Sequence, residues 1–217
     1  MLLSTIYLLS PVLLVLLLIS RKKGAKRGTW FSKPALSAAF VLCAVLNAQS
    51  WGTFELLMLC GFLLCFAGDV FLIPDSRKMF TVGLVAFLAG HLFYLGAFAS
   101  LASWEYALIV PAVLLTAIIL LVMRWLRPFL QDMRGPVVSY IVVISCMVLT
   151  AWALALNTGL PLTFRILVLG GAVGFFVSDL FVVRQRFVCK TFKNPLIGLP
   201  LYYGGQFALA ISLAYIE

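Results

Sequence analysis

The sequence contains eight apolar runs that are each long enough to cross a membrane. A transmembrane helix needs roughly 20 apolar residues to span about 30 Å of hydrocarbon. Of the 217 residues, 64% are apolar and 11% are charged, so no soluble domain remains outside the runs. The sequence therefore predicts one all-α domain over residues 1–217, a polytopic bundle of eight transmembrane helices at 2–20, 34–50, 54–73, 80–101, 105–123, 136–156, 165–183 and 196–216.

Basic residues gather in alternate connections between these runs. Of the 16 Lys and Arg side chains, only Arg165 lies outside the connections that follow the first, third, fifth and seventh runs. The positive-inside rule places those connections in the cytoplasm and both termini on the non-cytoplasmic side. The net charge of +9 is then a topology signal, and no nucleic-acid surface is predicted. Short loops indicate a bacterial inner membrane, although the endoplasmic reticulum stays open.

Two acidic residues, Asp69 and Asp179, fall inside the apolar runs. Each costs up to about 3 kcal/mol at a helix centre, and a short carboxylate cannot extend to the interface as Lys or Arg does. The third and seventh runs cross the membrane in the same direction, and each Asp lies shortly before the predicted cytoplasmic end. Both carboxylates are therefore expected at the same depth, facing a cavity or a partner.

The residues around the two aspartates are alike. CFAGDVFLI at 65–73 resembles FFVSDLFVV at 175–183, and KPALS at 33–37 resembles GPVVS at 135–139. A four-span duplication would relate the halves by an axis along the membrane normal and would bring Asp69 and Asp179 face to face. Chance similarity between short membrane segments is the alternative.

Other polar side chains lie at depths from which they can reach a carboxylate. Inside the spans these are His91, Tyr94, Tyr140, Tyr202 and Gln206. A lone polar residue in a span also serves as a hydrogen-bonding link between helices. Lys33 is expected at the cytoplasmic rim, where Pro34 suits the first turn of the second span. Arg184 and Arg186 are expected at the same rim, and topology alone explains all three cations.

Two carboxyl groups at one depth can divide the work of an acid and a base, as glycosidases show. No metal or cofactor is needed for such chemistry, and none is predicted. A zinc hydrolase is the nearest alternative, but a single histidine beside two aspartates is a poor ligand set. The sequence has no GxSxG motif for a serine hydrolase, and its five cysteines show no CxxC spacing.

A family likeness rests on KP at 33–34, GD at 68–69, GHLFY at 90–94, SD at 178–179 and YYGGQ at 202–206. In this order over eight spans, these motifs resemble the YhhN/TMEM86 family of lysoplasmalogenases. The resemblance implies hydrolysis of the vinyl ether bond of lysoplasmalogens, a class of lysophospholipid, to a fatty aldehyde and glycerophosphoethanolamine or glycerophosphocholine. It also implies that Asp69 and Asp179 are the catalytic pair.

Vinyl ethers are acid-labile, which fits a pair of carboxyl groups. One Asp is expected to protonate the alkene carbon while the other stabilises the oxocarbenium ion and activates water. The sequence does not decide which Asp is the acid and which is the base. His91 and Tyr94 are expected to orient a carboxylate, Gln206 to hold the water or the ether oxygen, and Lys33, Arg184 and Arg186 to pair with the substrate phosphate.

Two other function classes remain open. Intramembrane aspartates with a histidine also suit a proton-coupled carrier of a lipid or small molecule, in which parallel repeats are common. A structural membrane protein, whose aspartates only bond neighbouring helices, is the third class. Headgroup and chain-length preference and the oligomeric state are not determined by the sequence.

Overall fold

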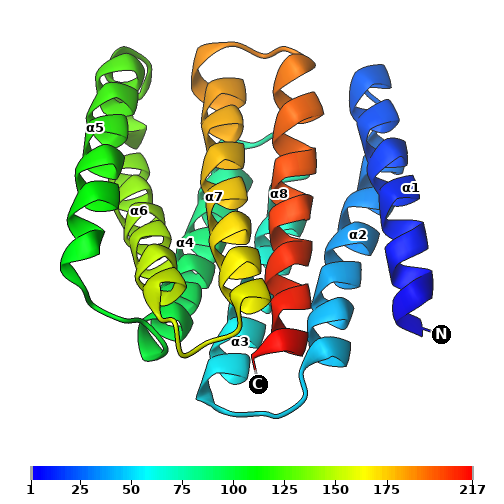
Figure 1. Cartoon of the computed structure of the whole chain (residues 1–217). Coiled ribbons are helices and arrows are strands. Elements are labelled where there is room, and N and C mark those ends of the chain that lie inside the picture. The colour runs from blue at the N-terminus through cyan, green and yellow to red at the C-terminus, as the bar shows by residue number, and fades with distance from the viewer. Residues whose placement is uncertain (1, 217) are drawn as a thin grey trace.

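The computed structural model describes residues 2–216 and is helical throughout its long elements (Figure 1). The eight long helices are α1 Leu2–Lys23, α2 Lys26–Asn47, α3 Thr53–Phe71, α4 Arg77–Ser100, α5 Ile109–Leu126, α6 Arg134–Leu156, α7 Leu162–Val183 and α8 Lys193–Ser212. Each of them, with its short flanking turns where present, is long and apolar enough to cross a membrane. The predicted all-α membrane bundle is confirmed.

Five short helical segments lie next to the long helices. Most of them extend a long helix by one turn, because the connections are too short for separate structure. They are η1 Tyr106–Leu108, η2 Arg127–Phe129, η3 Gln131–Met133, the π-helical η4 Arg184–Val188 and η5 Leu213–Tyr215.

The start of α2 differs most from the predicted span. Residue 34 was expected to open this helix, but α2 begins at Lys26 and carries Pro34 in its interior. Gly24 reverses the chain with φ of +65°, and the Ala25 amide donates to the Ser20 carbonyl at 2.9 Å. Because this turn is complete at Ala25, the charged residues that resembled a loop form the first turns of the helix instead.

Six helices form a closed ring in the order α2, α3, α4, α6, α7 and α8, each packed against the next. The remaining two lie outside it, with α1 against α2 and α8, and α5 against α6 (Figure 1). Aromatic rings from five of the ring helices fill the interior, including Phe40, Phe62, Phe87, Phe175 and Tyr202. The ring therefore supplies the core, while α1 and α5 present mostly apolar, exposed faces.

The packing of the first four helices is repeated in the last four. The neighbours α1–α2, α2–α3 and α3–α4 correspond to α5–α6, α6–α7 and α7–α8, and the contact α4–α6 corresponds to α8–α2. Matching glycines join the two tightest pairs. A Cβ on Gly90 would lie 3.2 Å from the Gly61 carbonyl oxygen, and one on Gly205 would lie 2.8 Å from that of Gly171. These close approaches are of the kind that small residues allow between membrane helices.

All helix directions place four connections at one end of the bundle, which is the upper end in Figure 1. We call it the basic end, because α1–α2, α3–α4, α5–α6 and α7–α8 join there and 15 of the 16 Lys and Arg residues lie on or near these connections. Helix α1 begins and α8 ends at the opposite end. The chain is therefore an integral membrane protein with a strongly polarised charge distribution, and its orientation in the membrane stays a prediction.

Candidate functional site

A cavity of about 550 Å³ opens at the basic end. Asp69 of α3 and Asp179 of α7 both line it, as do residues from α1, α2, α4, α6 and α8. The ring of helices thus brings the two carboxyl groups into one hollow, as their equal depth and the repeat predicted. Apolar side chains form most of the remaining wall, which includes Leu72, Leu84, Phe87, Val137, Phe181 and Leu199.

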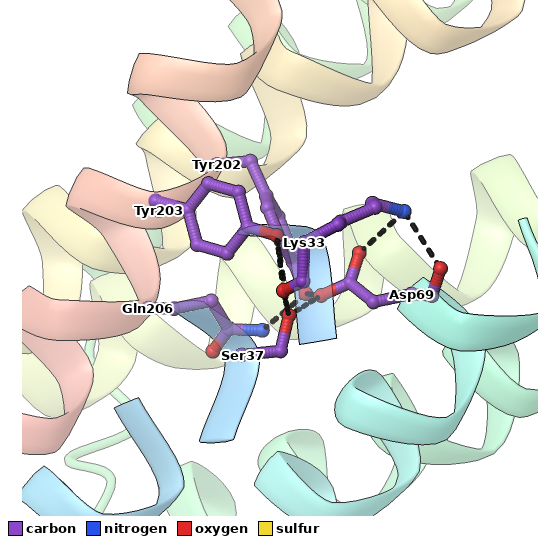
Figure 2. Close-up of polar contacts among 6 residues, drawn as sticks. All are labelled: Lys33, Ser37, Asp69, Tyr202, Tyr203 and Gln206. Carbon is purple, nitrogen blue, oxygen red and sulfur yellow. Dashed lines mark hydrogen bonds and ion pairs between the residues drawn. The ribbon is translucent and has the colours of Figure 1, made fainter. Parts of the chain in front are cut away.

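Asp69 is buried and receives donors from two other helices (Figure 2). Lys33 Nζ lies 2.9 Å from Asp69 Oδ1. The hydroxyls of Ser37 and Tyr202 donate to Asp69 Oδ2 at 2.6 and 2.7 Å. The ammonium and the two hydroxyl donors hold this carboxylate in a fixed orientation.

The burial of Lys33 corrects the prediction that this residue lies at the rim. Because α2 begins at Lys26, Lys33 lies two turns inside the helix, and only 4% of it is exposed. Its ammonium also donates to the main-chain carbonyl of Asp69 at 2.9 Å. Lys33 lines the deep part of the cavity, so it acts on Asp69 rather than on a group at the surface.

A chain of hydrogen bonds continues from Asp69 into the core. Tyr94 Oη donates to Gln206 Oε1 at 2.9 Å, and Gln206 Nε2 donates to Tyr202 Oη at 3.4 Å. Tyr202 completes the path to Asp69 (Figure 2). Tyr94 and Gln206 are fully buried behind Tyr202 and do not line the cavity. They are placed to orient the Tyr202 hydroxyl, whereas Gln206 is not placed to hold a water in the cavity.

Ser37 and Tyr203 belong to the same cluster and were not singled out from the sequence. Ser37 Oγ lies 3.2 Å from Tyr203 Oη, and Tyr203 Oη donates to the Lys33 carbonyl at 3.4 Å (Figure 2). Ser37 follows Lys33 by one helical turn in KPALS, so the helical period placed it on the same face as Lys33. Tyr203 had no comparable signal beyond its place in YYGGQ.

Asp179 has a much simpler environment. Its Oδ2 accepts one hydrogen bond, from Tyr140 Oη of α6 at 2.5 Å. No cation forms an ion pair with it among residues 2–216. A carboxyl group that is taken from water without a cation is destabilised in its charged form. The two aspartates therefore share a cavity but differ in what stabilises their charge.

The difference can be followed in an alignment of the two halves of the chain. If Gly90 is aligned with Gly205, Phe87 of α4 takes the place of Tyr202 of α8, and His91 takes the place of Gln206. In the same way, KPALS and GPVVS place Gly135 of α6 opposite Lys33 of α2. Phe87 and Gly135 offer Asp179 neither a hydroxyl nor an ammonium. Each half of the chain therefore supplies one aspartate, but the residues around the two aspartates differ.

His91 is buried next to the cavity rather than in it. Its ring lies 4.5 Å from that of Phe175 and 5.2 Å from that of Tyr140 between centroids. Neither ring nitrogen makes a hydrogen bond to any residue in the range 2–216 that meets ordinary geometric limits. The expected contact of His91 with a carboxylate is therefore replaced by an edge contact with Tyr140, the donor to Asp179.

The rim of the cavity carries charges of both signs. Of the two arginines predicted there, Arg186 lines the cavity and lies 3.0 Å from Asp75, whereas Arg184 bonds Asn194 of α8 and is not a lining residue. Arg21, Lys22 and Lys190 also line the rim and were not predicted as site residues. Their positions in the basic connections were read only as topology signals.

A metal ion in a protein site needs several donor side chains placed together. Within residues 2–216, no group of three or more His, Cys, Asp and Glu side chains is placed to hold one. His91 lies against the ring of Phe175, and Asp69 Oδ1 is already paired with Lys33 Nζ at 2.9 Å. The zinc ligand set considered from the sequence is therefore not assembled in this fold.

A ring of six membrane helices around a cavity with two aspartates from within the spans, Asp69 and Asp179, defines the class of this protein, a polytopic membrane protein with an intramembrane carboxyl site at its basic end. The sequence matches the YhhN family over residues 28–213, which is most of the chain. The protein belongs to the YhhN family. Comparisons with curated proteins and with solved structures gave no match.

Proposed function

We propose that this protein is a membrane hydrolase that cleaves the vinyl ether bond of lysoplasmalogens. The products are a fatty aldehyde and glycerophosphoethanolamine or glycerophosphocholine. The observation that carries the proposal is the unequal pair in the cavity, with Asp69 held by Lys33 and Asp179 bonded, among residues 2–216, to a tyrosine hydroxyl and to no cation. Membership of the YhhN family supports a lysoplasmalogenase-like protein.

Asp179 is the proton donor in this proposal, because it has no cationic partner and stays neutral most readily. Its proton goes to the alkene carbon remote from the ether oxygen, and the double-bond electrons form the new C–H bond. The adjacent carbon and the ether oxygen then share the positive charge of an oxocarbenium ion. The Asp179 carboxylate next accepts a proton from the water that adds to this ion.

Asp69 is the charged partner. Its carboxylate is held in place by Lys33, Ser37 and Tyr202, so it stabilises the oxocarbenium ion without having to reorganise. The resulting hemiacetal breaks its bond to the glycerol oxygen. Asp179 gives that oxygen a proton and takes the proton of the hemiacetal hydroxyl, which leaves an aldehyde and an alcohol and restores the enzyme.

The shape of the cavity fits an amphipathic substrate. Its walls are largely apolar between the two carboxyl groups, of which Asp69 is buried and Asp179 half-buried, and the charged rim, and its volume lies in the range of small-molecule sites. A lysolipid can place its vinyl ether at the aspartates while its phosphate stays near the rim. The substrate would enter from the membrane surface, because the cavity opens at the end where the helices terminate.

The test is aldehyde release from a vinyl-ether lysolipid by purified protein in detergent micelles. Asp69→Asn and Asp179→Asn should each abolish release while the thermal unfolding midpoint shows a folded protein. Asp132→Asn is the matched control, because Asp132 is an exposed carboxylate at the basic end that pairs with Arg77 outside the cavity. Normal turnover in either cavity variant would remove that residue from the mechanism, and loss of activity on chelation would restore the zinc alternative.

A proton-coupled carrier is the second candidate, and the parallel pairing of the two halves favours it. In that case, the Lys33–Asp69 pair would bind and release a proton during transport. Uptake of a lysolipid into sealed vesicles, driven by a proton gradient and without aldehyde release, would support the carrier. Hydrolysis in micelles, where no gradient exists, would support the hydrolase.

A further inference from the structure

The rim of the cavity carries more positive charge than its own carboxylate balances. Arg21 and Lys22 of α1 and Arg186 and Lys190 after α7 line it together with Asp75, which leaves a net charge of +3. Asp75 and Lys190 have side chains that are 74% and 64% exposed, whereas the Lys33–Asp69 pair is buried. These five residues therefore form the outer part of the cavity, which we call the rim cluster.

Arg21 is the cation without a protein partner. Among residues 2–216, no hydrogen bond or ion pair is made by its guanidinium, although the side chain lines the cavity. Lys22 lies beside it, with Nζ 5.9 Å from the centre of the Phe192 ring. A guanidinium has five N–H donors in a planar fork, which matches the oxygens of a phosphate.

The end of α1 is fixed in position by its turn to α2. Gly24 takes φ of +65°, and a Cβ on Gly28 would collide with the Ser20 side chain, so α1 and α2 pack closely there. Arg21 and Lys22 follow Ser20 directly. This contact holds them over the cavity that Lys33 of α2 lines from inside.

Arg186 is fixed by contacts of its own. It lies over the Phe80 ring at 4.5 Å and pairs with Asp75 at 3.0 Å, and Lys190 reaches the other Asp75 oxygen at 3.3 Å. Asn194 holds this segment by bonding Gln185 and the Cys189 carbonyl, each at 2.7 Å. The hydrogen bond from Lys190, with a smaller effect of Arg186, lowers the pKa of Asp75, so this carboxylate stays charged at neutral pH.

From these positions, we propose that the rim cluster is a phosphodiester-binding site, in which Arg21 and Arg186 hold the headgroup phosphate of a lysophospholipid whose chain enters the cavity. The inference rests on the proposed function for the identity of the lipid. It assigns α1, which lies outside the helix ring, a direct part in substrate recognition. The anionic phosphate would meet the unbalanced positive charge, and Asp75 would keep Arg186 and Lys190 in place before it binds.

The test measures binding without hydrolysis. The probe is a lysolipid with a saturated alkyl ether, which has no vinyl group to cleave, and its comparison is a 1-O-alkylglycerol with the same chain and no phosphate. Arg21→Gln should weaken binding of the phospholipid about 10-fold or more, because one charge-assisted hydrogen-bond donor set is lost. Binding of the alkylglycerol should not change, and Arg21→Lys should recover part of the loss.

Arg27→Gln is the matched control, since Arg27 is exposed at the same end and does not line the cavity. Equal weakening of both ligands, or no weakening by Arg21→Gln in a folded protein, would overturn the inference. Competition with inorganic phosphate tests whether the site binds a lipid headgroup or free phosphate. Displacement of the lysolipid at equal concentrations would assign the site to free phosphate and overturn the lipid site.

The headgroup site and the proposed hydrolase activity can fail independently of each other. Phosphate-dependent binding with no aldehyde release would remove the hydrolase and leave the headgroup site. Aldehyde release that is indifferent to Arg21 and to the phosphate would leave the hydrolase and remove the site.

Discussion

Lys33 Nζ lies 2.9 Å from the side-chain oxygen Oδ1 of Asp69 and also 2.9 Å from the main-chain oxygen of the same residue. One ammonium thus fixes both the carboxylate and the last turn of α3, which ends at Phe71. Both side chains are at least 95% buried. The pair is therefore a link between α2 and α3 as well as the source of a fixed charge in the cavity.

Lys33→Met should destabilise the protein by about 3–5 kcal/mol, because it leaves the Asp69 carboxylate buried without its cation. Lys33→Met combined with Asp69→Asn should recover much of this loss, since no charge is then left unpaired. Unfolding of both variants and of Asp69→Asn in a denaturing detergent completes a double-mutant cycle. Additive effects of the two substitutions would contradict the pair as a structural unit.

Tyr140→Phe should lower kcat for aldehyde release by roughly 10²-fold, in the range of one positioned proton-transfer group, because it removes the hydrogen bond from Tyr140 Oη to Asp179 Oδ2. KM should change little, since the ring and its contact with His91 remain. Tyr106→Phe, at a tyrosine that is 93% exposed, is the control. A changed KM with normal kcat would place Tyr140 in binding instead.

Gln206→Leu should cost about 1–3 kcal/mol in stability, because the buried hydroxyl of Tyr94 loses its acceptor. Tyr202→Phe, which removes a donor from Asp69 directly, should reduce activity more than Gln206→Leu does. Thermal unfolding and aldehyde release measured on both variants compare the two effects. An inactive Gln206→Leu that unfolds like the wild type would give Gln206 a role in the chemistry itself.

Gly205→Ala should destabilise the α7–α8 pair by about 1–3 kcal/mol, because the new Cβ would lie 2.8 Å from the Gly171 carbonyl oxygen. Gly204→Ala is a matched control, since no atom lies within 4 Å of a Cβ at that position. Unfolding midpoints in detergent measure both. Equal effects of the two alanines would contradict the close approach of α7 and α8.

The stability that the ion pairs of Asp75 contribute should be lost in acid. Lys190 and Arg186 lower the pKa of Asp75, so the pairs contribute stability above its ordinary pKa of about 4 and lose it as pH falls through the lowered value. The difference in unfolding midpoint between wild type and Asp75→Asn should be small, because the pairs are exposed. This difference in midpoint should stay constant from about pH 5 to 8 and vanish in stronger acid. A difference that grows as the pH falls would contradict the prediction.

Much of the fold could be predicted because each membrane span carries its own signal in its apolar length. The ends of the spans were less predictable where a helix continues beyond its apolar run into charged residues. Lys33 shows why, since a lysine beside an apolar run is normally at the interface, and only a partner on another helix makes its burial possible. The boundary of α2 at Lys26 follows from the Gly24 turn and not from hydropathy.

The two aspartates were predictable because a carboxylate inside an apolar run is costly wherever the helices pack. Their partners were not, since the donors come from residues far apart in the sequence, such as Ser37 and Tyr202 for Asp69. Arg21 and Lys22 were indistinguishable from other basic residues that set topology. Their place at the cavity depends on how α1 packs against α2.

The sequence alone determined that this chain crosses a membrane eight times, gathers its positive charge at one end and carries two acids at similar depth, because these properties are read along the chain. The tertiary structure decided that the acids share a cavity, that Lys33 pairs with Asp69 and that the hydroxyl of Tyr140 donates to Asp179. The physical reason is that the charge state of a buried carboxyl depends on the atoms that surround it, and helix packing supplies those atoms.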